Sequence, residues 1–154
     1  MTLRRVLVAF VVGLLLGPAS WWIAGLASGR FEPFDDSTGF FVCQAMLALP
    51  MGALAFRRGL LATLPALPGA WLGMNLYAYA LGSDETRAWI VLLLFSSLTL
   101  LMFPLAAMLA GGIGHALRRR GARRRAADDG MRSSASAPTG TRDAWAGRAD
   151  TSND

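Results

Sequence analysis

The sequence predicts an all-α integral membrane protein: a four-helix transmembrane bundle with both termini in the cytoplasm, followed by a disordered basic C-terminal tail. Hydrophobic residues make up 54% of the 154 residues and charged residues only 16%, whereas soluble domains carry about 25% charged residues. The few charged residues lie between four long uncharged stretches. This composition excludes a soluble enzyme. Because Cys43 is the only cysteine, it also excludes a secreted scaffold held by disulfides.

Four stretches free of Asp, Glu, Lys and Arg predict four membrane spans. A helix needs roughly 20 apolar residues to cross about 30 Å of hydrocarbon at about 1.5 Å per residue. Each of the four stretches approaches or exceeds that length. We expect the spans at about 6–28, 39–56, 60–82 and 88–117, which together form a transmembrane domain over 1–117.

The first stretch has two interpretations. Arg4 and Arg5 followed by an apolar core form the pattern of a signal peptide, with a cleavage site near Pro18. The apolar run continues, however, through Trp21 to Ala27, which makes a full-length span. We expect the span, and a mass measurement of the intact protein distinguishes the two interpretations.

Short polar connections are expected between the spans. The connection between the second and third spans is very short and contains the Arg57-Arg58 pair. These two spans should therefore form a tight antiparallel hairpin. Residues of the type that cap helix N-termini precede the second and fourth spans. These are Asp36 or Ser37 in the first case and Ser83 or Asp84 in the second.

Small residues and prolines predict how the spans pack. Small residues four positions apart lie on one helix face and let two helix backbones approach closely in lipid. Prolines remove a backbone hydrogen bond and tend to kink a helix. The small-residue pairs include Gly13 with Gly17, Gly69 with Gly73 and Ala107 with Gly111, and the prolines within the expected spans are Pro18, Pro50, Pro65, Pro68 and Pro104.

The arginines predict the orientation, since short cytoplasmic loops are enriched in basic residues. With four spans, Arg30 and Arg87 lie on one side, and the arginines before span one, between spans two and three and directly after span four lie on the other. Both termini should therefore be cytoplasmic. All 15 basic residues are Arg, which together with frequent Ala and Gly suggests a bacterial genome and a location in the inner membrane.

The composition changes abruptly after the fourth span. Residues 118–154 are rich in Arg, Ala, Ser, Gly and Asp and bury too little apolar surface to offset the entropy of ordering. We expect a disordered cytoplasmic tail, with a short helical extension over 116–127. Its arginines should contact anionic lipid headgroups at roughly 1 kcal/mol each, and nucleic acid is not expected as a partner because no aromatic residues interleave with them. The arginines of this cluster are Arg118, Arg119, Arg120, Arg123, Arg124 and Arg125.

Polar side chains occur at a similar depth in all four spans. Counted inward at about 1.5 Å per residue, they form one layer roughly 8 to 12 Å from the side that holds Arg30 and Arg87. One interpretation is structural, with Gln44 and Asn75 hydrogen bonded to each other across the second hairpin. The other is a small outward-facing polar cavity, lined also by Tyr79. The candidate residues are Ser20, Gln44, Asn75, Tyr79, Ser96 and Ser97.

Several kinds of chemistry have no residues to support them. No Asp, Glu, Lys or Arg lies within a span, and such residues normally mark ion pathways and proton relays in membranes. A single Cys43 and a single His115 do not make a thiol oxidoreductase, a haem site or a His-rich metal site. The acidic loop around Glu32 and Asp35 lacks the spacing of a calcium loop. We expect no enzyme, no cofactor and no metal.

The sequence therefore favours a small multi-pass bacterial inner-membrane protein with a non-enzymatic accessory or interaction role. The alternative is a subunit of a small oligomeric channel or transporter. The expected partners are the lipid bilayer and other membrane proteins or a second copy of this chain.

Overall fold

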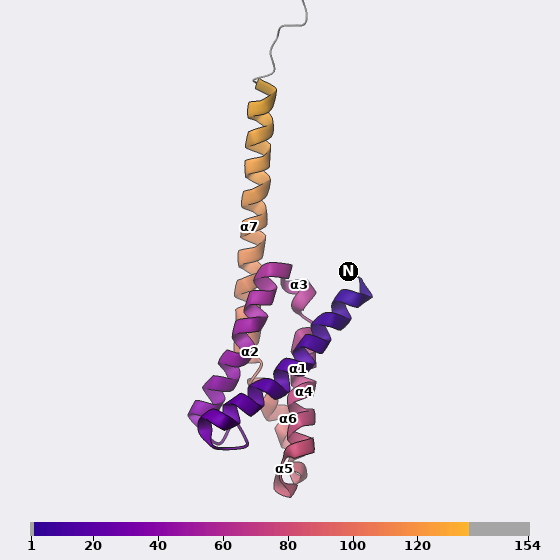
Figure 1. The fold of residues 1–154 in the computed structure, drawn as a ribbon, viewed down its shortest axis with the longest axis vertical. Helices are drawn as coiled ribbons and strands as arrows, with labels where there is room; N and C mark the ends of the chain where they lie inside the picture. Colours follow the sequence, from indigo (N-terminus) through magenta and orange to yellow (C-terminus); the bar gives the residue numbers. More distant parts are fainter. Residues whose placement is uncertain (1, 136–154) are drawn as a thin grey trace, which may run out of the picture. The chain divides into compact units, whose positions relative to one another are not determined.

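The structure, a computed structural model, describes residues 2–135, with the side chains of residues 130 and 132–135 excepted. Within this part the chain is all-helical and contains no strand (Figure 1). It divides into two units at the Leu117–Arg118 bond. We call the first unit, up to Leu117, the bundle. The helices are α1 (Leu3–Ser28), α2 (Ser37–Arg58), α3 (Leu60–Thr63), α4 (Ala66–Leu81), α5 (Asp84–Ala88), α6 (Ile90–Thr99) and α7 (Met102–Ala135).

Three helical stretches of the described residues are long and apolar enough to cross a membrane. They are α1, α2 and the stretch Ile90–Asp129, which contains α6 and most of α7. The expected third span is not one helix, because the chain turns at Leu64 and Pro65 between α3 and α4. Pro68 accounts for the turn, since a proline ring clashes with the carbonyl four residues earlier. The 16 residues of α4 alone are shorter than a typical span.

Helices α1 and α4 touch backbone to backbone through the predicted glycine pairs. At four glycines an added methyl group would overlap a carbonyl of the other helix. Because the contact partners advance in the same direction along both helices, α1 and α4 run parallel. In lipid the hydrophobic effect does not drive helices together, and such close backbone packing stabilises their association instead. Gly13 meets Ala66, Gly17 meets Ala70, Gly69 meets Phe10 and Gly73 meets Leu14.

A second parallel contact joins α2 to the first turns of α7. Gly52 lies against the Ala107 carbonyl, and Gly111 lies against the backbone of Gly52. At the end of this contact a ring nitrogen of His115, Nδ1, lies 2.9 Å from the Phe56 carbonyl oxygen. The small residues predicted at 107 and 111 therefore form the α2–α7 contact.

The expected fourth span is broken at Leu100 and Leu101, where α6 ends and α7 begins. Pro104 provides the reason, because it cannot donate to the carbonyl of Leu100 and its ring clashes with that group. The break sends the two halves to different neighbours: α6 contacts α4, and the start of α7 contacts α2.

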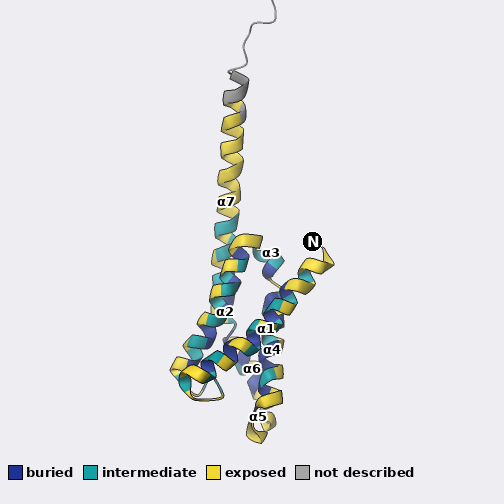
Figure 2. Cartoon of the chain, viewed as in Figure 1, coloured by how far each residue is buried: buried dark blue, intermediate teal, exposed yellow. Residues whose placement is uncertain are grey.

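Along each bundle helix buried positions alternate with exposed ones (Figure 2), and many of the exposed residues are large and apolar. Methionines contribute much of the interior. A surface of exposed Leu, Val, Phe and Trp is what a lipid-facing helix presents. The largest fully buried side chains include Trp21, Leu47, Met51, Met74, Leu100 and Met108.

The second unit differs from the expected disordered tail. Residues 118–135 continue helix α7, well beyond the expected end at 127. Ala and Arg have high helix propensity, and this local preference outweighs the lack of apolar residues to bury. Residues 136–154 of the expected tail lie outside the described part of the chain.

Candidate functional site

Asn75 and Ser97, two residues of the predicted polar layer, join α4 to α6. The Asn75 amide nitrogen donates to the Ser97 hydroxyl oxygen at 3.0 Å and to the Trp71 carbonyl at 2.8 Å. The Trp71 indole donates to the Leu94 carbonyl at 3.1 Å, one turn before Ser97. Both Asn75 and Ser97 are buried, so these hydrogen bonds form in an apolar surrounding, where an unpaired amide would be costly.

Gln44 supplies a hydrogen-bond acceptor where the helix is broken before Pro104. The first backbone N–H groups of a helix have no partner within that helix, and the break places such groups in the middle of the expected fourth span. The Gln44 side-chain oxygen accepts a hydrogen bond from the backbone N–H of Phe103 at 3.3 Å. A buried glutamine on α2 thus caps the beginning of α7, which is how broken helices are tolerated within membranes.

Ser20 belongs to a third contact, between α1 and α2. Its hydroxyl donates to the Gly17 carbonyl at 2.7 Å, and the Cys43 thiol donates to the Ser20 oxygen at 3.6 Å. All three residues are buried. Cys43 therefore behaves as a small core residue in contact with α1.

The buried residues of the predicted polar layer have separate hydrogen-bond partners on different helices. Gln44 and Asn75 bond to different partners and not to each other, so that prediction is wrong. Tyr79 is 57% exposed on the surface of α4. Within the described residues, every buried side-chain nitrogen and oxygen atom has a hydrogen-bond partner. Ser20, Gln44, Asn75 and Ser97 therefore each hydrogen bond to partners within the protein.

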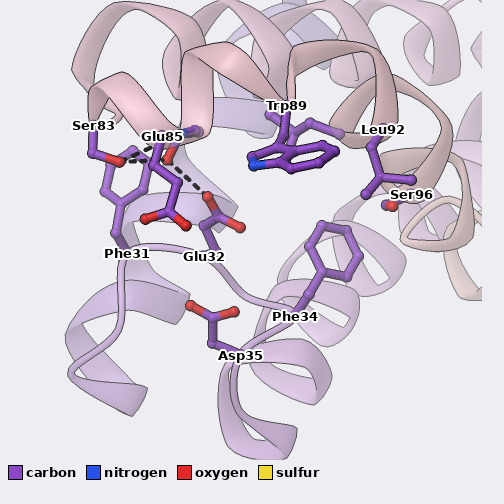
Figure 3. Close-up of a pocket in the computed structure, with 11 residues that line it drawn as sticks. Phe31, Glu32, Phe34, Asp35, Ser83, Glu85, Trp89, Leu92 and Ser96 are labelled. Atoms are coloured by element: carbon purple, nitrogen blue, oxygen red, sulfur yellow. Dashed lines mark hydrogen bonds between the residues drawn. The ribbon is translucent and has the colours of Figure 1, made fainter.

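Ser96 lines a pocket, whereas its neighbour Ser97 contacts Asn75 of α4. The pocket measures about 600 Å³ and lies at the end of the bundle formed by the loop 29–36 and residues 82–89. We call this end the acidic end, because it carries five carboxylates and two arginines, and we call the cavity the acidic-end pocket. Its lining comprises Phe31, Glu32, Phe34, Asp35, Ser83, Glu85, Thr86, Trp89, Leu92, Leu93 and Ser96 (Figure 3).

Aromatic contacts hold the loop side of this pocket in place. The Trp21 indole of α1 donates to the Phe31 carbonyl at 2.7 Å. Its ring lies 6.3 Å from the ring of Phe31 and 6.1 Å from that of Phe34. Phe31 also stacks on Tyr77 of α4, with ring centres 6.1 Å apart. The loop therefore contacts both α1 and α4, and these contacts position its side chains at the pocket.

A side-chain bond closes the loop onto the other wall of the pocket. The Thr86 hydroxyl of α5 donates to a carboxylate oxygen of Glu32 at 2.8 Å. The side-chain oxygen of Ser83 caps α5 by accepting from the Thr86 N–H, as predicted for a residue at this position. Glu32 thus lies on the pocket wall, held by a hydroxyl donor.

Asp36 caps α2, which confirms the prediction for this residue. Its carboxylate accepts hydrogen bonds from the N–H groups of Thr38 and Gly39 at 2.7 and 3.2 Å. These bonds, that from Gly39 above all, lower the pKa of Asp36, and the positive charge of Arg30 acts in the same direction.

The six arginines predicted to contact lipid lie on the part of α7 that belongs to the second unit. Their side chains are exposed, and at 100° per residue they are distributed around the whole helix. No apolar face accompanies them, so this segment is not an amphipathic helix that lies flat in a membrane surface. The residues are Arg118, Arg119, Arg120, Arg123, Arg124 and Arg125.

The sequence does not predict this pocket, although the acidic loop around Glu32 and Asp35 is apparent in it. Nothing in the spacing of the lining residues along the chain shows that α5 folds toward this loop. Comparison with family models, with curated proteins and with solved structures gives no match for this chain. The function is therefore argued from the contacts of this chain alone.

Proposed function

We propose that this chain is a four-span protein of a bacterial inner membrane, with both termini in the cytoplasm, and that its role is non-enzymatic: it acts as an accessory or interaction protein through helix contacts. The arginine asymmetry supports the orientation. Helices α3 and α4 together cover residues 60–81, a length of roughly 33 Å at 1.5 Å per residue, which supports counting them as one broken span.

The observation that carries the non-enzymatic role is the use of the polar side chains. Asn75, Ser97 and Gln44 are occupied by bonds between helices. In hydrocarbon such bonds hold helices together at roughly 0.6 to 2 kcal/mol each. Among the described residues, no set of three or more His, Cys, Asp or Glu side chains could hold a metal ion. A partner protein would contact the exposed apolar side chains on the outer surface of the bundle.

The alternative, a channel or transporter subunit, needs water near these polar groups. A pathway through the chain would leave Gln44 and Asn75 hydrated, whereas both are buried with partners in the protein. An oligomer could still form a pathway between copies of the chain. The accessory role requires no such pathway and is therefore preferred.

Two measurements test this proposal. Reporter fusions after Arg58 and after Arg125 should read cytoplasmic, and fusions after Asp36 and Glu85 periplasmic. Cysteines placed at positions 44 and 75 in a Cys43→Ala background should resist small water-soluble thiol reagents. A periplasmic signal after Arg58 would refute the topology. Rapid labelling at both positions would refute the accessory role and favour transport.

A further inference from the structure

The acidic-end pocket has the size and the lining of a small-molecule site. Its volume of about 600 Å³ falls within the roughly 300 to 1,000 Å³ typical of ligand pockets. Its walls combine aromatic and aliphatic side chains with a few polar groups, which is the usual composition of such sites. It comes from two segments far apart in the sequence: the loop 29–36 and residues 83–96, which contain α5 and most of α6.

The polar side of the pocket is negative. Glu32, Asp35 and Glu85 contribute carboxylates, and among the lining residues, all within the described chain, there is no Arg, Lys or His. Clefts lined by charges of one sign concentrate ligands of the opposite sign. The carboxylates do not converge as metal ligands do, since no group of three suited to a metal occurs among residues 2–135. The charge pattern therefore suits an organic cation better than a metal ion.

The apolar side of the pocket suits the body of such a cation. Figure 3 shows the rings of Trp89 and Phe34 facing the space on one side, with the carboxylates of Glu32 and Glu85 on the other. Trp is the aromatic residue with the strongest attraction for ammonium groups. The Trp89 side chain is 62% exposed, so its face is accessible to a ligand that enters from outside the bundle.

We propose that the acidic-end pocket binds an organic cation that carries an ammonium group on an apolar body. The ammonium group lies among Glu32, Glu85 and the Trp89 ring, and the apolar body contacts Phe34 and Leu92. Two sources can supply this chemistry: a free amphiphilic amine and the headgroup of a lipid that bears an ammonium group. This binding site is inferred from the pocket alone and does not require the accessory role proposed for the bundle.

The binding test compares two molecules of the same shape. Full-length protein in an uncharged maltoside detergent is titrated calorimetrically with phenyltrimethylammonium and, separately, with tert-butylbenzene, which replaces the charged nitrogen by carbon. The cation should bind saturably, one per chain, and at least about tenfold more tightly than the neutral molecule. Equal affinities, or no saturable binding of the cation, would overturn the proposal.

Matched variants locate the site. Glu32→Gln keeps an oxygen that can accept from Thr86, so the loop contact persists while the charge is lost. Combined with Glu85→Gln it should weaken binding about tenfold. Asp84→Asn removes a carboxylate from the same segment, but outside the pocket lining, and should leave the affinity unchanged. If Asp84→Asn weakens binding as much as the double variant, general charge and not the pocket attracts the cation, and the proposal fails.

A second matched pair tests the aromatic wall. Trp89→Leu should weaken binding of phenyltrimethylammonium about three- to tenfold. Trp22→Leu removes an indole that is exposed on α1 and does not line this pocket, so it should have no effect. Equal effects of the two replacements would contradict the proposed site.

Competition identifies the source of the ammonium group. Displacement of the probe by added phosphatidylethanolamine, but not by phosphatidylglycerol, assigns the site to a lipid headgroup. No displacement by either lipid assigns it to a free amphiphilic amine. Displacement by both lipids alike would show that the site does not select an ammonium group, which overturns the proposal.

Discussion

At the scale of single residues, the buried polar side chains of the bundle all have hydrogen-bond partners. Asn75 and Ser97 connect two helices, Gln44 caps a third, and Asp36 begins the helix that carries Gln44. A buried polar group stabilises a fold when its partner is present and destabilises it when the partner is removed. The contribution of each pair can therefore be measured by removing its two members singly and together.

We predict a coupling between Asn75 and Ser97. Asn75→Leu and Ser97→Ala should each destabilise the bundle, and the double variant should cost less than the sum by about 0.6 to 1.7 kcal/mol, because no amide is then left unpaired. Reversible unfolding in mixed micelles measures these differences. Ser96→Ala is the control, since Ser96 lines the pocket, and its effect should add to that of Asn75→Leu. Additivity in both cycles would contradict the assigned hydrogen bond.

A second prediction concerns Asp36 and pH. Because the folded state lowers the pKa of this carboxyl, its contribution to stability is complete above the unfolded pKa of about 3.9 and is lost as the pH falls through the folded pKa. Asp36→Ala should therefore lower the melting temperature at pH 7, and the difference from the parent protein should shrink below about pH 4. Asp35→Ala, which removes the neighbouring carboxylate but no cap, is the control and should leave the melting temperature at pH 7 unchanged.

At the scale of the helices, prolines and glycines decide the architecture. Pro18 and Pro50 lie within α1 and α2 without interrupting them, whereas the chain breaks before Pro68 and Pro104. Glycines set the distances between helices, since the α1–α4 contact leaves no room for a side chain at Gly13 or Gly69. The bundle is therefore specified by where its helices are interrupted and by where they come close.

We predict that the break at Pro104 makes Gln44 necessary. Gln44→Leu should destabilise the protein by about 1 to 3 kcal/mol, because the Phe103 N–H is left unpaired. In a Pro104→Ala background the two helices can join, and Phe103 can donate to the Thr99 carbonyl four residues earlier. There the same replacement should cost clearly less in the same unfolding assay. An equal loss of stability in both backgrounds would show that Gln44 does not compensate for the helix break before Pro104.

A further prediction tests the glycine contact. Gly13→Ala should destabilise the bundle by about 1 to 3 kcal/mol, since its methyl group would overlap the Ala66 backbone. Gly121→Ala is the matched control, because an added methyl group there meets no atom within 4 Å. That replacement should be neutral or stabilise helix α7 by up to about 1 kcal/mol. A Gly13→Ala protein as stable as the parent would contradict the packing described for α1 and α4.

At the scale of the whole molecule, the sequence was informative about local structure and silent about partners. The uncharged stretches, the Asp36 cap and the spaced glycines follow from short-range rules, and the structure contains them all. The partner of Asn75 depends on how the chain bends between α6 and α7, and the pocket depends on how α5 folds toward the loop. Neither is encoded by spacing along the chain. The helical extension expected over 116–127 continues to Ala135, because the helix propensity of Ala and Arg outweighs the lack of apolar residues to bury.

The parallel contact between α1 and α4 also constrains the order in which the protein is made. The glycine face of α1 can pair only after α4 has been synthesised, and α4 ends at Leu81, 64 residues after Gly17 by count along the chain. At about 5 to 20 residues per second, that face stays unpaired for roughly 3 to 13 seconds. A nascent chain halted after Thr63 would keep it open indefinitely. We predict that such a chain is cross-linked to its own copies in the membrane, and that Gly13→Leu abolishes the cross-link, because during synthesis the unpaired glycine face accepts any helix that fits it.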